Sequence, residues 1–206
     1  VIQRHAILRT RFVLDDKGQY LQEVHNEPFP IEENINPDEF VHRIFDLTTG
    51  HPLRAGLYDD YLLIVFHHIA FDEWSGFILE KELQNADLPP LEIQYKDFAV
   101  WQRALIEARQ DELVSYWKTR LADITPLQMP TDYPRPVDID YQGASVAFTL
   151  PNELKALSTE YNVTPYAILL AGLAMTLSRY TGQTDLTIGT PVANRQHPQL
   201  AHLIGF

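Results

Sequence analysis

The feature that most constrains the fold is the run 61–66, Tyr-Leu-Leu-Ile-Val-Phe, which is followed directly by two histidines. Six consecutive apolar residues, entered from the turn-forming pair Asp59 and Asp60, predict a buried β-strand. Because successive side chains of a strand point to opposite faces, His67 and His68 are predicted to meet different surroundings. One histidine is therefore expected to face a substrate and the other the scaffold.

The residues that follow this strand limit the kinds of reaction that the chain could catalyse. A neutral imidazole with an ordinary pKa near ~6.5 exchanges a proton at cellular pH, and Asp72 could orient the ring or tie the loop down. Two histidines on opposite faces of a strand cannot close on one metal ion, and the chain has no cysteine to complete a ligand set. Ser75 lacks the Gly-x-Ser-x-Gly frame of a hydrolase nucleophile, so the sequence gives little support to a serine hydrolase.

Composition excludes several other classes. With 206 residues, 45% of them hydrophobic, the chain can bury a substantial core as one large domain or two small ones. Its net charge of -12 and its lack of any basic run argue against non-specific binding to nucleic acid. No apolar stretch approaches the ~20 residues that span a bilayer. The absence of cysteine fits a reducing, cytoplasmic compartment.

Periodicity and turn residues predict a chain that mixes helices and strands. Both ends look cut, which predicts a piece of a longer protein. Four prolines between residues 126 and 143 predict a linker. In order, the predicted elements are a hairpin of strands 7–14 and 20–24, a helix started by Asn36, a helix 74–84 capped by Asp72, a long helix from about 95 to 122, a strand 144–150, and helices 151–161 and 165–182. The last helix is apolar enough that it is expected to be buried.

Four motifs occur in a fixed order along the chain. Arg-His-x-x-Leu-Arg-Thr-x-Phe stands at 4–12, and His-His-x-x-x-Asp followed by Trp-Ser spans 67–75. Tyr-x-Asp-Phe-Ala-x-Trp stands at 95–101, and Ile-Gly-x-Pro-x-Ala-x-Arg at 188–195. Together they resemble the motifs of condensation domains of nonribosomal peptide synthetases, a branch of the chloramphenicol acetyltransferase-like acyltransferases.

The resemblance implies an α/β fold, a two-layer sandwich built as two acetyltransferase-like halves with a channel between them. Residues 1–125 would be most of the first half, 126–143 the linker and 144–206 the start of the second. It also implies that the domain joins a donor aminoacyl or peptidyl thioester to an acceptor amine, in the biosynthesis of a secondary metabolite such as a peptide antibiotic or siderophore. Both substrates would be attached to the 4'-phosphopantetheine arms of peptidyl carrier domains. An adenylation domain of the same synthetase would be adjacent to this domain.

Roles for individual residues follow from the same resemblance. His68 would be catalytic, accepting or organising the proton of the amine or stabilising the tetrahedral intermediate. No metal, no directly bound cofactor, no nucleic acid and no membrane are expected. The supporting and lining residues would be His67 for the fold, Asp72 paired with Arg9 for the shape of the loop, and Trp74, Ser75 and Gly76 along the channel.

Other interpretations stay open at this point. The two histidines could simply pack at the end of the strand, with Asp72 only capping a helix, and Arg9 could be a solvated residue of the hairpin. Glu73 stands where the family commonly has glycine; if the site needs positive φ or close approach of a carrier arm there, the domain could bind carriers without catalysis. An ester-forming or epimerising relative of the same fold is a further alternative. Four of the six other histidines are expected to be surface or structural residues: His5, His25, His42 and His51.

Overall fold

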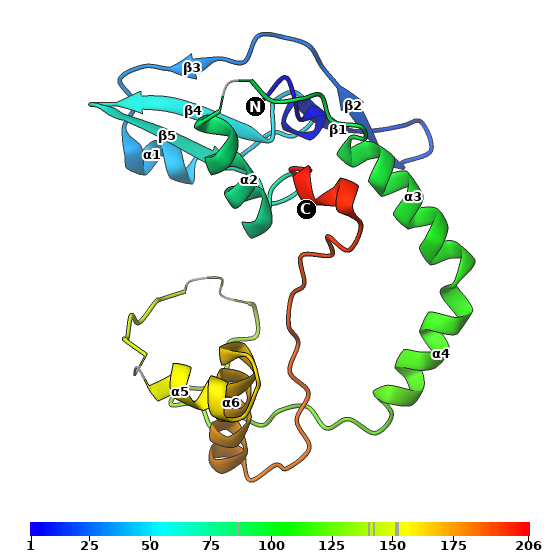
Figure 1. The fold of residues 1–206 in the computed structure, drawn as a ribbon, viewed down its shortest axis with the longest axis vertical. Helices are drawn as coiled ribbons and strands as arrows, with labels where there is room; N and C mark the ends of the chain where they lie inside the picture. The colour runs from blue at the N-terminus through cyan, green and yellow to red at the C-terminus, as the bar shows by residue number, and fades with distance from the viewer. Residues whose placement is uncertain (86, 140, 142, 151–152) are drawn as a thin grey trace. The chain divides into compact units, whose positions relative to one another are not determined.

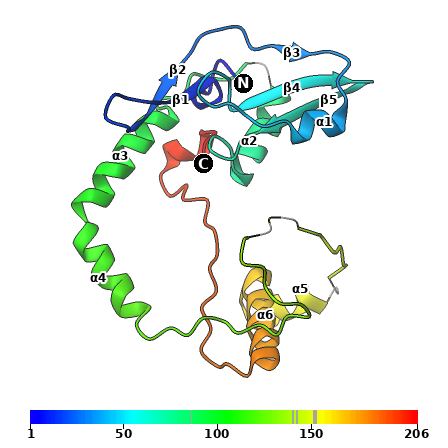
Figure 2. The same cartoon turned by 180° about the vertical axis from the view of Figure 1, so that it is seen from behind.

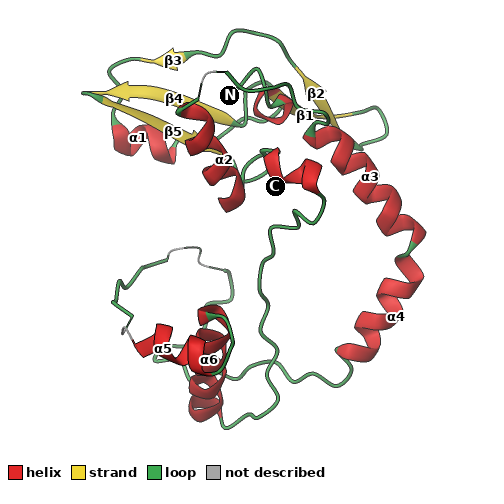
Figure 3. Cartoon of the chain, viewed as in Figure 1, coloured by secondary structure: helices red, strands yellow, loops and turns green. Residues whose placement is uncertain are grey.

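The computed structural model describes residues 1–85, 87–139, 141, 143–150 and 153–206. They form two compact units, Val1–Asp111 with Val192–Phe206, and Glu112–Pro191. Figures 1 and 3 show the elements, which are η1 (Ala6–Arg9), β1 (Thr10–Leu14), β2 (Tyr20–Val24), β3 (Ile31–Glu32), α1 (Pro37–His42), β4 (Leu53–Tyr58), β5 (Tyr61–Phe66), α2 (Glu73–Leu83), α3 (Tyr95–Ala108), α4 (Gln110–Arg120), α5 (Glu153–Glu160), α6 (Pro165–Thr181) and η2 (Pro198–His202).

The first unit begins with the predicted hairpin. β1 and β2 pair antiparallel, with Thr10 opposite Val24 and Leu14 opposite Tyr20. Gly18 has φ +74° in the turn, a conformation that glycine adopts without steric cost. The first strand starts later than predicted because residues 6–9 form the 3₁₀ helix η1, in which Ala6, Ile7 and Leu8 are buried.

A second sheet carries the histidine motif at one end. β4 lies between β3, to which it is parallel, and β5, to which it is antiparallel, with Leu53 opposite Phe66. The prediction of a buried β5 is wrong at its start, because Tyr61 is 73% exposed and Leu62 48%. β5 is an edge strand of the sheet that the structure describes, so neighbouring chain covers it from one side only.

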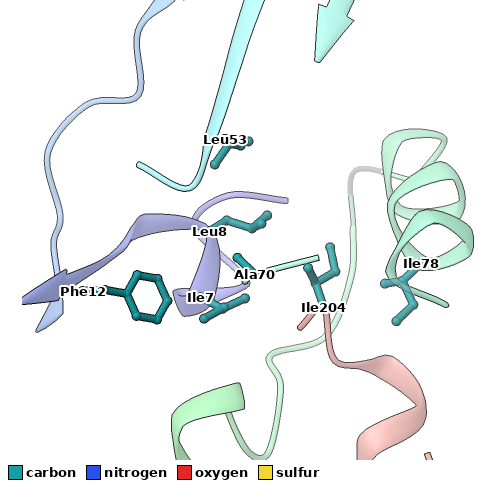
Figure 4. Close-up of a cluster of buried hydrophobic side chains, with 7 residues drawn as sticks. All are labelled: Ile7, Leu8, Phe12, Leu53, Ala70, Ile78 and Ile204. Atoms are coloured by element: carbon teal, nitrogen blue, oxygen red, sulfur yellow. The ribbon is translucent and has the colours of Figure 1, made fainter. Parts of the chain in front are cut away.

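The core of this unit is assembled from segments far apart in the sequence (Figure 4). Ile7, Leu8 and Phe12 come from the N-terminal region, whereas Ile204 comes from the last residues. The remaining members of the cluster are Leu53, Ala70 and Ile78. Since Leu8 is 0% and Ile204 1% exposed, the C-terminal segment is an integral part of this core.

Capping residues set where the helices of this unit begin. Asn36 accepts a hydrogen bond from the backbone N–H of Asp38 at 3.1 Å, and Pro37 takes the first position of α1, as predicted. The helix ends at His42, and Ile44, two residues later, is 92% exposed.

The long helix predicted over about 95–122 is interrupted. α3 begins with a capping box between Gln94 and Asp97, and Arg109 then leaves helical geometry, with φ −114° and ψ 12°. α4 follows directly at Gln110. Within α3, Phe98 is 5% exposed, whereas Trp101 is 56% exposed.

The second unit contains α5 and α6, which pack against each other. Thr164 caps α6 and Gly182 ends it in the left-handed conformation with φ +73°, as the sequence predicted. The expected burial of α6 is wrong, since none of its residues is buried. Described residues 144–150 form no strand, so the strand predicted there is wrong. The predicted start of α5 at 151–152 lies outside the described residues.

The two units divide the chain differently from the predicted subdomain boundaries, which stay a prediction. Residues Val192–Phe206, which the resemblance assigned to the second half, belong to the first unit. Within this unit, η2 lies beside α2 in both views of the molecule (Figures 1 and 2). Among the described residues, no helix combines the length and apolar character needed to cross a membrane.

Candidate active site

The histidine loop, residues 67–72, follows β5 and opens with a tight turn. The backbone N–H of His67 donates to Pro52 O at 2.8 Å, which extends the β4–β5 pairing by one residue. His67 Nδ1 then accepts a hydrogen bond from the N–H of Ile69 at 3.1 Å, and the ring packs edge-on against Phe45 with the centroids 5.7 Å apart. His67 thus contacts other residues of the chain, and its supporting role stays a prediction.

His68 meets surroundings different from those of His67, as predicted, but both residues lie beyond Phe66 and not in the strand. Its side chain is exposed, and Nδ1 lies 2.7 Å from the backbone oxygen of Phe71. A carbonyl oxygen only accepts hydrogen bonds, so Nδ1 carries a proton, and in the neutral imidazole Nε2 carries the lone pair. The ring also lies perpendicular to that of Phe206, with the centroids 4.9 Å apart. Nε2 is thus the nitrogen that is available to a substrate.

Asp72 fixes the far end of the loop through both carboxylate oxygens. Oδ1 accepts from the backbone N–H of Ser75 at 2.8 Å and from its hydroxyl at 2.6 Å, which makes Asp72 the N-cap of α2. Oδ2 lies 3.1 Å from Nη2 of Arg195. The side chains of Arg195 and Asp72 are only 6% and 16% exposed, so this ion pair is largely shielded from water.

The predicted pairing of Asp72 with Arg9 is wrong. Arg9 donates to the backbone oxygen of His25 at 3.0 Å, to that of Gln3 at 3.4 Å and to the side-chain oxygen of Asn26. It lies at the end of η1, where its guanidinium reaches the chain that leaves β2 rather than the histidine loop. Arg195 belongs to the fourth sequence motif but was not among the predicted site residues, and no spacing along the chain could assign it to Asp72.

The residues predicted to line a channel have distinct environments. Trp74 is 39% exposed and donates its indole N–H to Ala201 O at 3.1 Å. Ser75 is 0% exposed, so its hydroxyl braces the structure rather than lining an open channel. A Cβ added at Gly76 would meet no atom of another part of the chain within 4 Å, and a lining role for Gly76 and for Trp74 stays a prediction. Glu73 is exposed in the first turn of α2 with helical backbone, so no positive φ is required at that position.

Arg4 and His5 of the N-terminal motif take part in a buried polar cluster. His5 is 1% exposed and its Nε2 lies 2.9 Å from Glu82, which also accepts a hydrogen bond from Arg4 Nε at 2.9 Å. Burial lowers the pKa of His5 despite the opposing hydrogen bond to Glu82. Burial acts to raise the pKa of Glu82, but the hydrogen bonds from Arg4 and His5 outweigh it and the pKa is lowered. Sequence reasoning expected His5 to be a surface or structural residue, and the structure gives it a buried, structural role.

The mixed α/β fold and the braced histidine loop together define a chloramphenicol acetyltransferase-like domain. The chain belongs to the Condensation domain family, which matches it over residues 1–206. The predicted family and fold class are confirmed by this match and by the X-domain from teicoplanin biosynthesis, whose crystal structure superposes with a TM-score of 0.80 at 25% identity, covering 99% of this chain and 53% of that one.

Two relatives are peptide synthetases. Phosphinothricin tripeptide synthetase PhsC of Streptomyces viridochromogenes is 38% identical over 241 residues, covering 99% of this chain. Gramicidin S synthase 2 of Brevibacillus brevis is 37% identical over 231 residues, covering 100% of this chain. The chain spans only 22% of the length of the first relative and 5% of the second.

Proposed function

We propose that this domain forms an amide bond between a donor aminoacyl or peptidyl thioester and the amine of an acceptor, each held on the phosphopantetheine arm of a carrier domain. Support comes from the membership of the condensation domain family and from relatives that are peptide synthetases. In this proposal the domain is an acyltransferase that works beside carrier and adenylation domains of one synthetase, in the cytoplasm.

The observation that carries the mechanism is the orientation of His68. With Nδ1 engaged by Phe71 O, the lone pair of Nε2 is free to accept a hydrogen bond from the attacking amine. The amine nitrogen forms its bond to the thioester carbonyl carbon, the carbon–sulfur bond breaks, and the proton that the amine loses passes by way of Nε2 to the departing thiolate. No net proton is gained or lost.

The rest of the loop keeps this nitrogen in place. Asp72, held by Arg195 and Ser75, fixes the segment in which the backbone oxygen of Phe71 lies. Much of the rate gain comes from bringing two tethered reactants together, so an imidazole that is held still adds to catalysis without large movement. The channel in which the two arms meet is part of the proposal.

The test is His68→Ala in the complete condensation domain, assayed with two loaded carrier proteins. We expect peptide formation to fall roughly 10²- to 10⁴-fold, the range for a positioned proton acceptor. His42→Ala is the matched control, because His42 is also exposed and its Nδ1 also lies 2.7 Å from a backbone oxygen, that of Asp38, but it belongs to α1. Unchanged peptide formation by His68→Ala would refute the assigned role.

The same assay separates this proposal from a domain that only docks carriers. Normal carrier binding without product in the wild-type protein would favour docking alone. That alternative was based on Glu73, whose helical backbone requires no positive φ. Whether its side chain obstructs a carrier arm is what the assay tests, and we expect product to form.

A further inference from the structure

The last residues of the chain reach the histidine loop from more than a hundred positions away. Residues 203–206 follow η2 and lie beside α2 and the loop (Figures 1 and 2). The ring of Phe206 stands perpendicular to the imidazole of His68 at a centroid distance of 4.9 Å. Phe206 is nevertheless 61% exposed, so it borders the site rather than filling the core.

The backbone next to Phe206 is held by the same groups that hold Asp72. The N–H of Gly205 donates to the hydroxyl of Ser75 at 3.0 Å, and Arg195 Nη2 donates to Gly205 O at 3.1 Å. Ser75 and Arg195 are also the two partners of the Asp72 carboxylate. The position of Phe206 and the shape of the histidine loop are therefore set by one network.

Two further side chains fix this segment from its other sides. Tyr95 donates its hydroxyl hydrogen to Phe206 O at 2.9 Å, and His5 Nδ1 accepts from the N–H of Ile204 at 3.3 Å. The Tyr95 ring lies so close to Gly205 that an added Cβ would be 2.1 Å from its Cδ2. Real Cβ atoms do not come this close to another heavy atom, so any residue but glycine at 205 must displace Phe206 or Tyr95.

These contacts bear on how His68 is oriented. A single hydrogen bond at Nδ1 selects the tautomer but leaves the imidazole free to tilt about that bond. A perpendicular aromatic neighbour restricts the tilt, because edge-to-face packing is favourable over a limited range of angles. We propose that Phe206 is a positioning residue that keeps His68 Nε2 directed toward the amine, an inference that rests on the proposed function of His68.

The first test is Phe206→Ala in the complete domain with loaded donor and acceptor carriers. We expect kcat to fall roughly threefold to tenfold, the equivalent of one aromatic pair, while KM for both carriers stays within about twofold. Phe206→Tyr keeps the ring and should retain the wild-type kcat. Phe77→Ala is the matched control, since Phe77 is 64% exposed on α2 of the same unit and should leave kcat unchanged. A rise in KM at unchanged kcat would overturn the inference.

The second test asks whether Phe206 acts through His68. If it does, Phe206→Ala causes no further loss in a His68→Ala background. An equal loss in both backgrounds would overturn the positioning role but leave the proposed function intact. Full activity of His68→Ala alone would instead overturn the proposed function, and this inference with it.

A third variant leaves the aromatic ring itself unchanged. Gly205→Ala adds the Cβ that collides with Tyr95, so it should lower kcat as Phe206→Ala does, and the loss should again vanish in the His68→Ala background. Circular dichroism and the melting temperature identify variants that fail to fold. A folded Gly205→Ala domain with wild-type kcat would contradict the inference.

Discussion

The ion pair between Asp72 and Arg195 gives a quantitative test of the site as the structure has it. Asp72→Asn removes the charge that faces Arg195 but keeps an oxygen that can cap α2, since asparagine and aspartate cap helices about equally well. Arg195→Met removes the guanidinium and keeps much of its aliphatic length. The two single variants and the double variant form a cycle that isolates the pair.

The expected magnitude follows from the burial of the two groups. Hydrogen bonds to charged groups contribute about 1.5–3 kcal/mol, and breaking a buried pair by removing one partner costs about 3–5 kcal/mol. Asp72 keeps 16% exposure and its hydrogen bonds from Ser75, so the lower range applies. We expect each single substitution to lower the free energy of unfolding by about 2–3 kcal/mol, with a coupling energy of about 1.5–3 kcal/mol.

The measurement is urea unfolding of the complete domain at pH 7. A second cycle, between Asp72→Asn and Arg9→Met, is the control, because Arg9 contacts other residues and its effect should be additive within about 0.5 kcal/mol. Coupling of Asp72 to Arg9 and not to Arg195 would refute the structural assignment and restore the pairing predicted from the sequence.

Two further predictions concern the interior of the first unit. Leu8 is 0% exposed, so Leu8→Ala should lower the free energy of unfolding by about 2–5 kcal/mol; a loss below about 1 kcal/mol in urea unfolding would mean that Leu8 is not in a packed core. Burial lowers the pKa of His5 below its ordinary value of 6.5 in the folded protein. As the pH falls below about 6.5, His5 therefore takes up a proton in the unfolded chain before it does so in the folded one. The free energy of unfolding then decreases by at most about 1.4 kcal/mol per pH unit. His5→Asn should remove this component, which unfolding at pH 7.5, 6.5 and 5.5 would detect; an unaltered pH slope would show that His5 does not cause it.

The sequence by itself determined the features that depend on near neighbours. The caps Asn36 and Asp72 were predicted at the right residues, because each acts on backbone groups within a few positions. The motifs indicated the family for the same reason, since their residue types and spacing are read along the chain.

Tertiary structure decided which distant groups meet. Arg9 and Arg195 both stand in motifs, and local spacing gives no measure of which guanidinium reaches a carboxylate 63 or 123 positions away. The burial of Ser75 and the contact of Phe206 with His68 likewise depend on residues 203–206 packing into the N-terminal core. The exposure of α6 shows that composition alone does not decide burial. Apolar composition favours burial, but a helix is buried only where another part of the structure covers it.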